Sequence, residues 1–403
     1  MKVAKLIFVS ENNHNKFYTM TDDGNQITVE FGRVDSKPRI ATYSSYQWDK
    51  LYNEKIKKGY TDVTSYSVEI DSSVGTTDIF NGISIDIKSV LKFLIDCAKT
   101  KISDNYNISS DKVTQAMIDR AQELINQISN TYNEKFKYDE RNLSDSDISE
   151  FNHLFLELYK IIPRKMKRVA DYLIHKGSSD EIKEFLINEQ SLLDTLEGQV
   201  QTKPIVDVST NSQNILDEIN CTIELVNDKK ESDLVYALFE SNKRYIKNIY
   251  KVNNKNTEKE FNPDNLKTNL LFHGSRNENW FNIIKSGLLI RPACAQITGA
   301  MFGQGCYFAN KAQKSKGYTS APGSYWARGN AHKYFLAVYE VATGNQKHIY
   351  RHTSDCYNIT YNKLKKEGYD SVYAHAGNSL RNDEFMIYKT NQSTIRYLIE
   401  LEE

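Results

Sequence analysis

Four short patterns in the last third of the chain bring together side chains that can do chemistry. They supply an imidazole, a glycine backbone, two hydroxyl groups, two phenol rings and a carboxylate. The residues are His273, Gly274, Ser275, Tyr307, Ser315, Tyr318 and Glu384. Alone, each has a plainer reading as a structural histidine, a core tyrosine or a solvated acid. Because imidazole and carboxylate groups commonly move protons or stabilise charge, the set as a whole is a candidate catalytic site.

The segment that holds Tyr307, Ser315 and Tyr318 is free of acids. No Asp or Glu lies between Glu278 and Glu340, a stretch of 61 residues. The same stretch carries seven cations, which are Lys285, Arg291, Lys311, Lys314, Lys316, Arg328 and Lys333. A chance deficit on a basic face is the plainer interpretation. A cleft for a phosphate-bearing ligand is the sharper one, because a basic segment without acids creates a positive potential.

Charge is distributed unevenly along a chain whose formal net charge is zero. The 403 residues include 52 Lys and Arg and 52 Asp and Glu. Residues 1–80 carry 10 basic and 11 acidic groups, residues 81–200 carry 16 and 20, and residues 201–403 carry 26 and 21. The three blocks therefore have net charges of −1, −4 and +5. The total excludes a chain that is a polycation throughout, but it does not exclude local basic surfaces.

Hydropathy and cysteine usage disfavour a membrane-spanning, secreted or disulfide-rich protein. No apolar run approaches the roughly 18 residues of a membrane-spanning helix, and the N-terminal apolar run is too short for a signal peptide. The five cysteines are widely spaced without a C-x-x-C pair, which disfavours a disulfide framework or a cysteine zinc site. His348 and His352 have i,i+4 spacing, but no Glu lies between them, so we expect no metal site. We expect a protein that is not secreted and has no membrane partner, nuclear in a eukaryote and cytoplasmic in a bacterium.

The elements that must position the candidate site fall into three consecutive regions with different hydropathy patterns. Residues 1–70 predict strands at 3–10, 16–20 and 26–31, a hairpin turn at 22–25 and a helix at 45–58. Residues 84–200 change to helical periodicity and predict five or six helices. A linker without periodicity follows at 201–214. From 215 onward an α+β domain is predicted, with its strands at 269–273, 305–309, 334–341, 371–374, 384–388 and 395–401 and its helices at 232–250 and 279–286.

The order and spacing of the four patterns resemble the catalytic domain of the poly(ADP-ribose) polymerases. Residues 84–200 are similar to that family's helical regulatory domain, and residues 1–75 resemble a WGR domain whose signature is Phe31-Gly32-Arg33-Val34 here. The resemblance implies a multidomain α+β protein. Its parts would be a small β-rich WGR-like nucleic-acid-binding domain at 1–80, an all-α regulatory, autoinhibitory bundle at 81–200 and a mixed α/β ADP-ribosyltransferase catalytic domain at 215–403.

The resemblance also implies roles for the candidate residues, with NAD+ as the substrate and no metal. Gly274 would pair with the nicotinamide amide through its backbone, which no side chain obstructs, and Ser315 would add a hydroxyl. Tyr318 and Tyr307 would pack on the two faces of the nicotinamide ring. His273, with Ser275 beside it, would bind the adenine-side ribose. Glu384 would stabilise the oxocarbenium-like charge on the other ribose and polarise the acceptor hydroxyl.

Two positions depart from the family pattern. Phe31 stands where the WGR signature has Trp, so a ring remains for stacking but the indole N–H is lost. Leu289 occupies the place of the family arginine, and Arg291 follows two residues later. We therefore expect Phe31 still to stack on nucleic acid, but without the contribution of an indole N–H.

A basic, aromatic stretch in the first block is the expected nucleic-acid surface. Residues 33–58 contain seven cations and three acids, a net charge of +4, with aromatic residues interleaved. A solvated helix face is the alternative interpretation. With the resemblance, the expected contacts to phosphates and bases are Phe31, Arg33, Lys37, Arg39 and Trp48.

These observations favour a DNA-break-dependent NAD+ ADP-ribosyltransferase that makes poly(ADP-ribose) on protein acceptors, itself included, and releases nicotinamide. The helical domain is expected to obstruct the NAD+ site until DNA binds. One alternative is a mono-ADP-ribosyltransferase of the same fold that acts on protein or nucleic-acid ends. The other is a DNA-end binding module with weak or no catalysis, against which the intact His273, Tyr307 and Glu384 argue.

Overall fold

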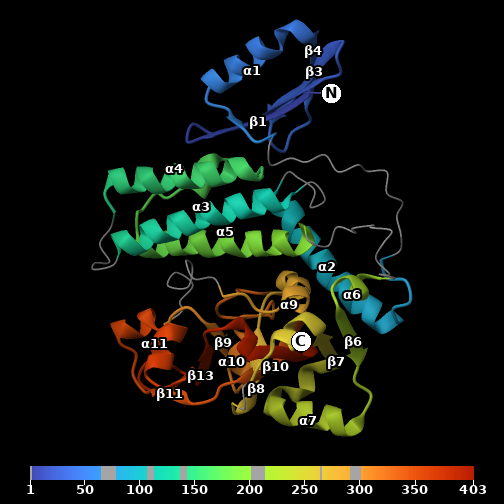
Figure 1. The fold of residues 1–403 in the computed structure, drawn as a ribbon, viewed down its shortest axis with the longest axis vertical. Coiled ribbons are helices and arrows are strands. Elements are labelled where there is room, and N and C mark those ends of the chain that lie inside the picture. The colour runs from blue at the N-terminus through green and yellow to red at the C-terminus, as the bar shows by residue number, and fades with distance from the viewer. Residues whose placement is uncertain are drawn as a thin grey trace. The chain divides into compact units, whose positions relative to one another are not determined.

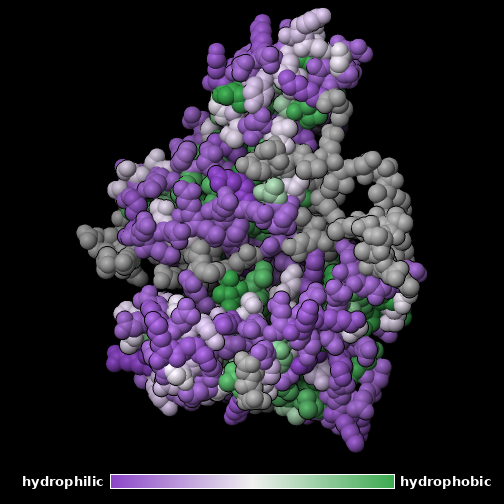
Figure 2. All heavy atoms as spheres, in the orientation of Figure 1, coloured by the Kyte–Doolittle hydropathy of each residue, from purple (hydrophilic) through white to green (hydrophobic). Residues whose placement is uncertain are grey.

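The computed structural model describes residues 2–64, 79–106, 113–136, 143–200, 214–263, 266–290 and 301–403 (Figure 1). Its contacts divide the chain into two compact units. The N-terminal unit comprises Met1–Val74 and Lys99–Lys203, and the C-terminal unit comprises Gly75–Ala98 and Pro204–Glu403. Hydrophilic residues cover most of the visible face of each unit (Figure 2). Within the described ranges, no helix combines the length and apolar character needed to span a bilayer.

A five-stranded antiparallel sheet opens the N-terminal unit, in the order β4-β3-β2-β1-β5. Its strands are β1 (Lys2–Ser10), β2 (His14–Asp22), β3 (Gln26–Arg33), β4 (Arg39–Ser44) and β5 (Thr61–Asp62), and helix α1 covers Trp48–Lys57. The predicted turn joins β2 to β3, where Asp23 Oδ1 accepts from the N–H groups of Asn25 and Gln26 and Gly24 has a φ of 98°. Strand β4 was not predicted from the sequence.

Three long helices complete the N-terminal unit, α3 (Gln115–Lys135), α4 (Asp145–Ile161) and α5 (Ser179–Val200). They lie side by side with α3 in contact with both others (Figure 1). Helix α4 begins with a reciprocal capping box between Ser144 and Asp147. The predicted linker at 201–214 lies outside the described residues except for Asn214, which caps the short helix α6 (Ile215–Glu218).

A buried ion pair lies within this helical layer. Arg164 Nη1 donates to Glu189 Oε2 at 3.1 Å, and the two side chains are only 5% and 6% exposed. The guanidinium carbon lies 5.0 Å, 5.8 Å and 5.5 Å from the ring centroids of Tyr106, Tyr159 and Tyr172. Such a pair depends on both partners, because either charge left alone in this apolar surrounding would be strongly destabilising.

The C-terminal unit is built on two sheets. The first has the order β6-β7-β14-β10-β8 and the second β11-β12-β13-β9. The first contains β6 (Cys221–Leu225), β7 (Ile246–Asn254), β14 (Ser393–Glu402), β10 (Lys333–Ala342) and β8 (Thr268–Gly274). The second contains β11 (Gln346–Ile349), β12 (Ser371–Ala374), β13 (Glu384–Ile387) and β9 (Cys306–Phe308). The two sheets meet where Phe272 and Ala309 exchange backbone hydrogen bonds of 2.8 and 3.0 Å.

Short helices cover these sheets. They are α7 (Lys229–Phe239), α8 (Lys255–Glu260), α9 (Trp280–Ser286), α10 (Ala312–Lys316) and α11 (Tyr361–Lys366). The predicted helix at 232–250 is wrong in its second half. After a 3-10 turn at Glu240–Tyr245, Ile249, Tyr250 and Val252 are buried in β7 between β6 and β14. Pairing with the neighbouring strands β6 and β14 therefore outweighs the local helical pattern at residues 246–250.

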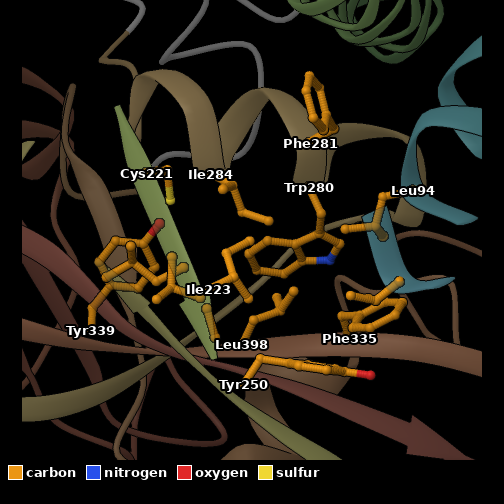
Figure 3. Close-up of a cluster of buried hydrophobic side chains, with 14 of the residues drawn as sticks. Leu94, Cys221, Ile223, Tyr250, Trp280, Phe281, Ile284, Phe335, Tyr339 and Leu398 are labelled. Atoms are coloured by element: carbon orange, nitrogen blue, oxygen red, sulfur yellow. The ribbon is translucent and has the colours of Figure 1, made fainter. Parts of the chain in front are cut away.

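The core of the C-terminal unit also takes in the first part of α2 (Ile85–Asn105). Leu91 and Leu94 are fully buried in the cluster that contains Trp280 and Phe335. Trp280 points from α9 toward the strands, and Leu94 reaches it from α2 (Figure 3). Residues 81–98 therefore belong to the C-terminal unit, whereas the sequence analysis had grouped them with the helical segment at 81–200.

Candidate active site

His273 is the second-last residue of strand β8, and its imidazole is fixed by the neighbouring sheet. Its Nδ1 lies 3.0 Å from the carbonyl oxygen of Tyr307. Since a carbonyl can only accept, Nδ1 carries the proton and donates. Burial lowers the pKa of His273, although the hydrogen bond to Tyr307 opposes this. A neutral ring in this tautomer leaves Nε2 as an acceptor for a ligand hydroxyl.

Gly274 lies against the backbone of α10 and has no room for a side chain. A Cβ at this position would lie 2.0 Å from the carbonyl oxygen of Ser315. Helix α10 is held in this place because the Ser315 hydroxyl donates to the carbonyl of Phe272 at 3.2 Å. The two residues therefore present a backbone edge and a hydroxyl side by side. Ser275 lies next in the chain, and its Oγ accepts from Asn279 at 3.1 Å.

Two tyrosines follow along the acid-free segment. The Tyr307 hydroxyl donates to the carbonyl of Gly303 at 2.8 Å and accepts from the N–H of Phe302 at 3.0 Å, which fixes its ring. Tyr318 is 39% exposed, so its ring is open to a ligand. Burial is the main cause that raises the pKa of both phenols, and the charge of Glu384 raises it further. Tyr307 pairs with Met386 of β13, two residues after Glu384.

Glu384 is the first residue of β13 and is 7% exposed. Its Oε1 forms an ion pair of 2.5 Å with Lys314 Nζ, and the same nitrogen lies 5.7 Å from the centroid of the Tyr318 ring. Lys314 is a site residue that sequence reasoning missed. Its position one residue before Ser315 on α10 was the available signal, but the partner lies 70 residues later in the chain.

The predicted residues of the site therefore come together. Their shared contacts link β8, β9, α10, the segment after α10, and β13, and the residues are His273, Gly274, Ser275, Tyr307, Ser315, Tyr318 and Glu384. The arrangement offers aromatic rings, an unobstructed backbone edge at Gly274, a neutral imidazole acceptor and a buried carboxylate. Such a set can hold a planar amide-bearing ring while the carboxylate stabilises a cationic centre.

An aromatic extension borders Tyr318. Trp326 stacks on the Tyr318 ring, with centroids 6.1 Å apart and planes at 15°, and it is 60% exposed. The backbone N–H of Trp326 donates to the carbonyl of Gly317 at 3.0 Å, which fixes the loop beside α10. Sequence reasoning did not single out Trp326, because stacking between residues eight apart in a loop leaves no periodic signal.

The positive potential expected of the acid-free segment is partly neutralised. Three of its lysines form ion pairs with acids from elsewhere in the chain. The pairs are Lys314 with Glu384, Lys316 with Glu403 and Lys333 with Glu400. Tertiary contacts thus supply the acids that the local sequence lacks. Arg291 lies outside the described residues.

The expected nucleic-acid surface needs two corrections. Trp48 is 7% exposed and packs in the core of the N-terminal sheet, with Lys2 Nζ 4.5 Å from its ring, so it has no free face for a base. Arg33 is occupied by its own chain. It donates to the carbonyls of Asn13 at 2.8 Å, Met166 at 3.0 Å and Lys167 at 2.8 Å.

The other residues of that surface keep the exposure that a ligand would need. Lys37 and Arg39 are exposed, and Phe31 is partly buried with its ring 6.0 Å from Tyr18. Tyr46, which is 99% exposed, lies in the 3-10 turn Ser45–Gln47 that follows β4. Of the five expected contacts, the two cations Lys37 and Arg39 are therefore exposed.

Comparisons with known proteins find a family match within the C-terminal unit and a relative that matches nearly the whole chain. The model of the poly(ADP-ribose) polymerase catalytic domain matches residues 229–403. The poly [ADP-ribose] polymerase-like protein 100L of Invertebrate iridescent virus 6 is 37% identical over 34% of this chain and 71% of its own length. The uncharacterized protein 101L of the same virus is 35% identical over 53% of this chain and 83% of its own. Poly [ADP-ribose] polymerase 2-B of Oryza sativa is 23% identical over 96% of this chain and 70% of its own length.

Proposed function

Since this chain belongs to the poly(ADP-ribose) polymerase family and is an NAD+ ADP-ribosyltransferase, we propose that it makes poly(ADP-ribose) on protein acceptors when it binds broken DNA. The observation that carries the proposal is the convergence of Glu384, Lys314 and two tyrosines beside His273 and Gly274. Nicotinamide is the leaving group. Protein acceptors include the chain itself.

The donor NAD+ is held by groups whose geometry suits each part of it. The nicotinamide amide pairs with the backbone of Gly274 and the Ser315 hydroxyl, and its ring lies on Tyr318 with Tyr307 beside it. The neutral Nε2 of His273 accepts a hydrogen bond from the adenine-side ribose. These contacts fix the C1′–N bond near Glu384, which turns a random encounter into an oriented one.

The chemical step breaks the bond between C1′ of the ribose and the nicotinamide nitrogen. The bonding electron pair leaves with nicotinamide, whose ring loses its positive charge, and the ribose becomes oxocarbenium-like. The Glu384 carboxylate stabilises that charge. An acceptor hydroxyl then forms the new bond to C1′, and its proton passes to the carboxylate. Lys314 holds the carboxylate in place through their ion pair.

Substitution Glu384→Gln tests this assignment. It keeps the shape of the side chain and removes its charge, so polymer should disappear while some NAD+ turnover remains. The measurement is gel analysis of products from radiolabelled NAD+ together with nicotinamide release. Glu367→Gln is a matched control, since Glu367 is an exposed partner of Lys347. A Glu384→Gln enzyme that still makes long chains would contradict the role of Glu384.

DNA binding rests on the exposed edge of the N-terminal sheet. Lys37 and Arg39 are the cations proposed to contact phosphates, and Phe31 supplies a ring. Each phosphate contact contributes about 0.9 to the slope of log affinity against log salt. The double substitution of Lys37 and Arg39 by Ala should therefore weaken binding to a blunt DNA duplex and lower that slope by about 2. An unchanged slope would exclude these two contacts.

Regulation is proposed to pass from this sheet to the helical segment through Arg33. DNA binding shifts an equilibrium in which the helical segment obstructs the NAD+ site, and the bonds from Arg33 to residues 166 and 167 join the two elements. Arg33→Ala should abolish stimulation by DNA while basal activity persists. A deletion that removes the obstruction should begin at residue 99 rather than 84, because Leu91 and Leu94 belong to the other core.

One assay separates this proposal from its alternatives. NAD+ consumption and product length are measured with and without broken DNA. A ladder of long products that depends on DNA supports the proposal. A single short adduct indicates a mono-ADP-ribosyltransferase, and DNA binding without NAD+ consumption indicates a binding module.

A further inference from the structure

Helix α10 carries two residues of the donor site but is too short to hold its own place. It covers only Ala312–Lys316, and a helix of that length is not stable by itself in water. Lys314 forms the ion pair with Glu384, and the Ser315 hydroxyl donates to the carbonyl of Phe272. The positions of both side chains therefore depend on the tertiary contacts that fix the helix.

Lys316, the last residue of α10, makes a different set of contacts. Its Nζ lies 2.5 Å and 2.6 Å from the two carboxylate oxygens of Glu403. The same nitrogen is 5.6 Å from the ring centroid of Tyr245 and 5.6 Å from that of Tyr334. The side chains of Lys316 and Glu403 are only 18% and 17% exposed. Burial shields this pair from solvent and salt, so it holds its geometry better than an exposed ion pair does.

The first sheet of the C-terminal unit fixes Glu403 in turn. Glu403 directly follows β14, and His332 directly precedes β10, which pairs with β14. The N–H of Glu403 donates to the carbonyl of His332 at 3.0 Å. The Tyr334 hydroxyl donates to Glu403 Oε1 at 3.0 Å. The carboxylate is therefore a fixed acceptor on the sheet, to which a short helix can be anchored.

The geometry of a helix links this anchor to the donor site. Side chains two residues apart on an α-helix are rotated by about 200°, so Lys314 and Lys316 point in nearly opposite directions. Lys314 reaches Glu384 on β13 of the second sheet, whereas Lys316 reaches Glu403 at the end of β14 in the first. Two ion pairs on opposite sides thus hold α10 between the sheets. Loss of the pair at Lys316 would let Lys314 and Ser315 move together.

We propose that Lys316 and Glu403 are positioning residues for the donor site. Their ion pair holds α10 where the Ser315 hydroxyl meets the nicotinamide amide and where Lys314 fixes Glu384. The inference rests on the donor-site contacts proposed above for NAD+. Lys316 and Glu403 act on the substrate through α10, and their contribution is to reduce the freedom of groups that must be oriented before the reaction.

Substitution Lys316→Met keeps the alkyl part of the side chain between the two rings and removes its charge. A displacement of 1 Å can cost about 100-fold, so a smaller shift of α10 should raise the KM for NAD+ about tenfold. The inhibition constant of nicotinamide should rise by the same factor, because nicotinamide uses the same amide contacts. Lys316→Arg keeps the charge and should retain both constants. Lys347→Met is a matched control, since Lys347 of β11 pairs with Glu367 at the same 2.5 Å.

Two further measurements use the full chain. Glu403→Gln should have the same effect as Lys316→Met, and the double variant should be no worse than either, because all three remove one interaction. Hydrogen exchange should become faster in Lys316→Met at the amides of Gly317, Tyr318 and Thr319, which donate to carbonyls of α10. Calorimetry should show every variant folded at the assay temperature.

The outcomes separate this inference from the function on which it rests. Wild-type constants in Lys316→Met would overturn it, as would an equal loss in Lys347→Met or in Lys316→Arg. Faster exchange with unchanged KM and nicotinamide inhibition would also overturn it, because the ion pair would then only stabilise the fold. If the wild type consumes NAD+ but nicotinamide does not inhibit it, while exchange still rises in Lys316→Met, the proposed amide contact falls and the anchoring of α10 stands.

Discussion

Replacement of Gly274 by Ala tests whether the donor site depends on the close approach of two backbones. The new Cβ would lie 2.0 Å from the carbonyl oxygen of Ser315 and 3.3 Å from Thr319 Cγ2. Since such contacts require about 3 Å or more, β8 and α10 must separate by about 1 Å. Both surfaces that hold the nicotinamide amide then move. A displacement of about 1 Å can lower a catalytic rate about 100-fold.

The assay is steady-state NAD+ turnover over a range of NAD+ concentrations, alongside calorimetric unfolding. For Gly274→Ala, kcat/KM should fall about 100-fold, and overpacking should lower the free energy of unfolding by about 1–3 kcal/mol. Gly317→Ala is the matched control, because Gly317 caps the C-terminal end of α10, the helix that Gly274 contacts. Its Cβ would meet Lys314 O at 3.3 Å and Trp326 Cδ1 at 3.6 Å, so its kcat/KM should change only a few-fold. A Gly274→Ala enzyme with wild-type kcat/KM, or an equal loss in both variants, would refute the reasoning.

Three other predictions concern the helical layer, the aromatic loop and the imidazole. Glu189→Leu should lower the free energy of unfolding by about 3–5 kcal/mol by leaving Arg164 buried and unpaired, and the added Arg164→Met should recover most of it, as calorimetry would measure. An unrecovered double variant would mean that the pair has a role beyond charge balance. Trp326→Ala should raise the KM for NAD+ several-fold at constant kcat by freeing Tyr318, with rescue by Trp326→Phe and no change in Tyr325→Ala. Burial lowers the pKa of His273 below 6.5, so its contribution to stability is present above pH 6.5 and is lost as the pH falls below it. In unfolding measurements, His273→Gln should lack this loss of stability below pH 6.5. A stability-against-pH profile identical to that of the wild type would exclude the contribution of His273.

The candidate site was largely predictable because its residues lie in short, ordered patterns. Glu384 and Tyr318 were expected from the sequence, and the structure brings both close to the Lys314 ammonium group. Lys314 was not expected in this role, because its ion pair joins α10 to the start of β13 and no local pattern records that contact. The stack of Tyr350 on His375 was missed for the same reason, since the two residues meet only through the pairing of β11 with β12.

The helices and strands likewise divide into those that the sequence predicts and those that only tertiary contacts explain. The alternation in β1 to β3 and the helical periodicity of α3 and α4 are local properties, so the sequence predicts them. Residues 246–250 were assigned to a helix because their apolar residues fit that period as well. Their burial between β6 and β14 comes from strands distant in the sequence.

The sequence by itself determined the order of the candidate site residues along the chain and the family resemblance. It also determined the change from strand-like to helical and then to mixed hydropathy patterns. Only the tertiary structure decided which groups are free to act. Arg33 and Trp48 have suitable side chains for nucleic acid, but the first bonds to backbone carbonyls and the second fills a core. A residue type fixes what a side chain can do, whereas burial and partners fix what remains available to a ligand, and these depend on contacts between residues far apart in the chain.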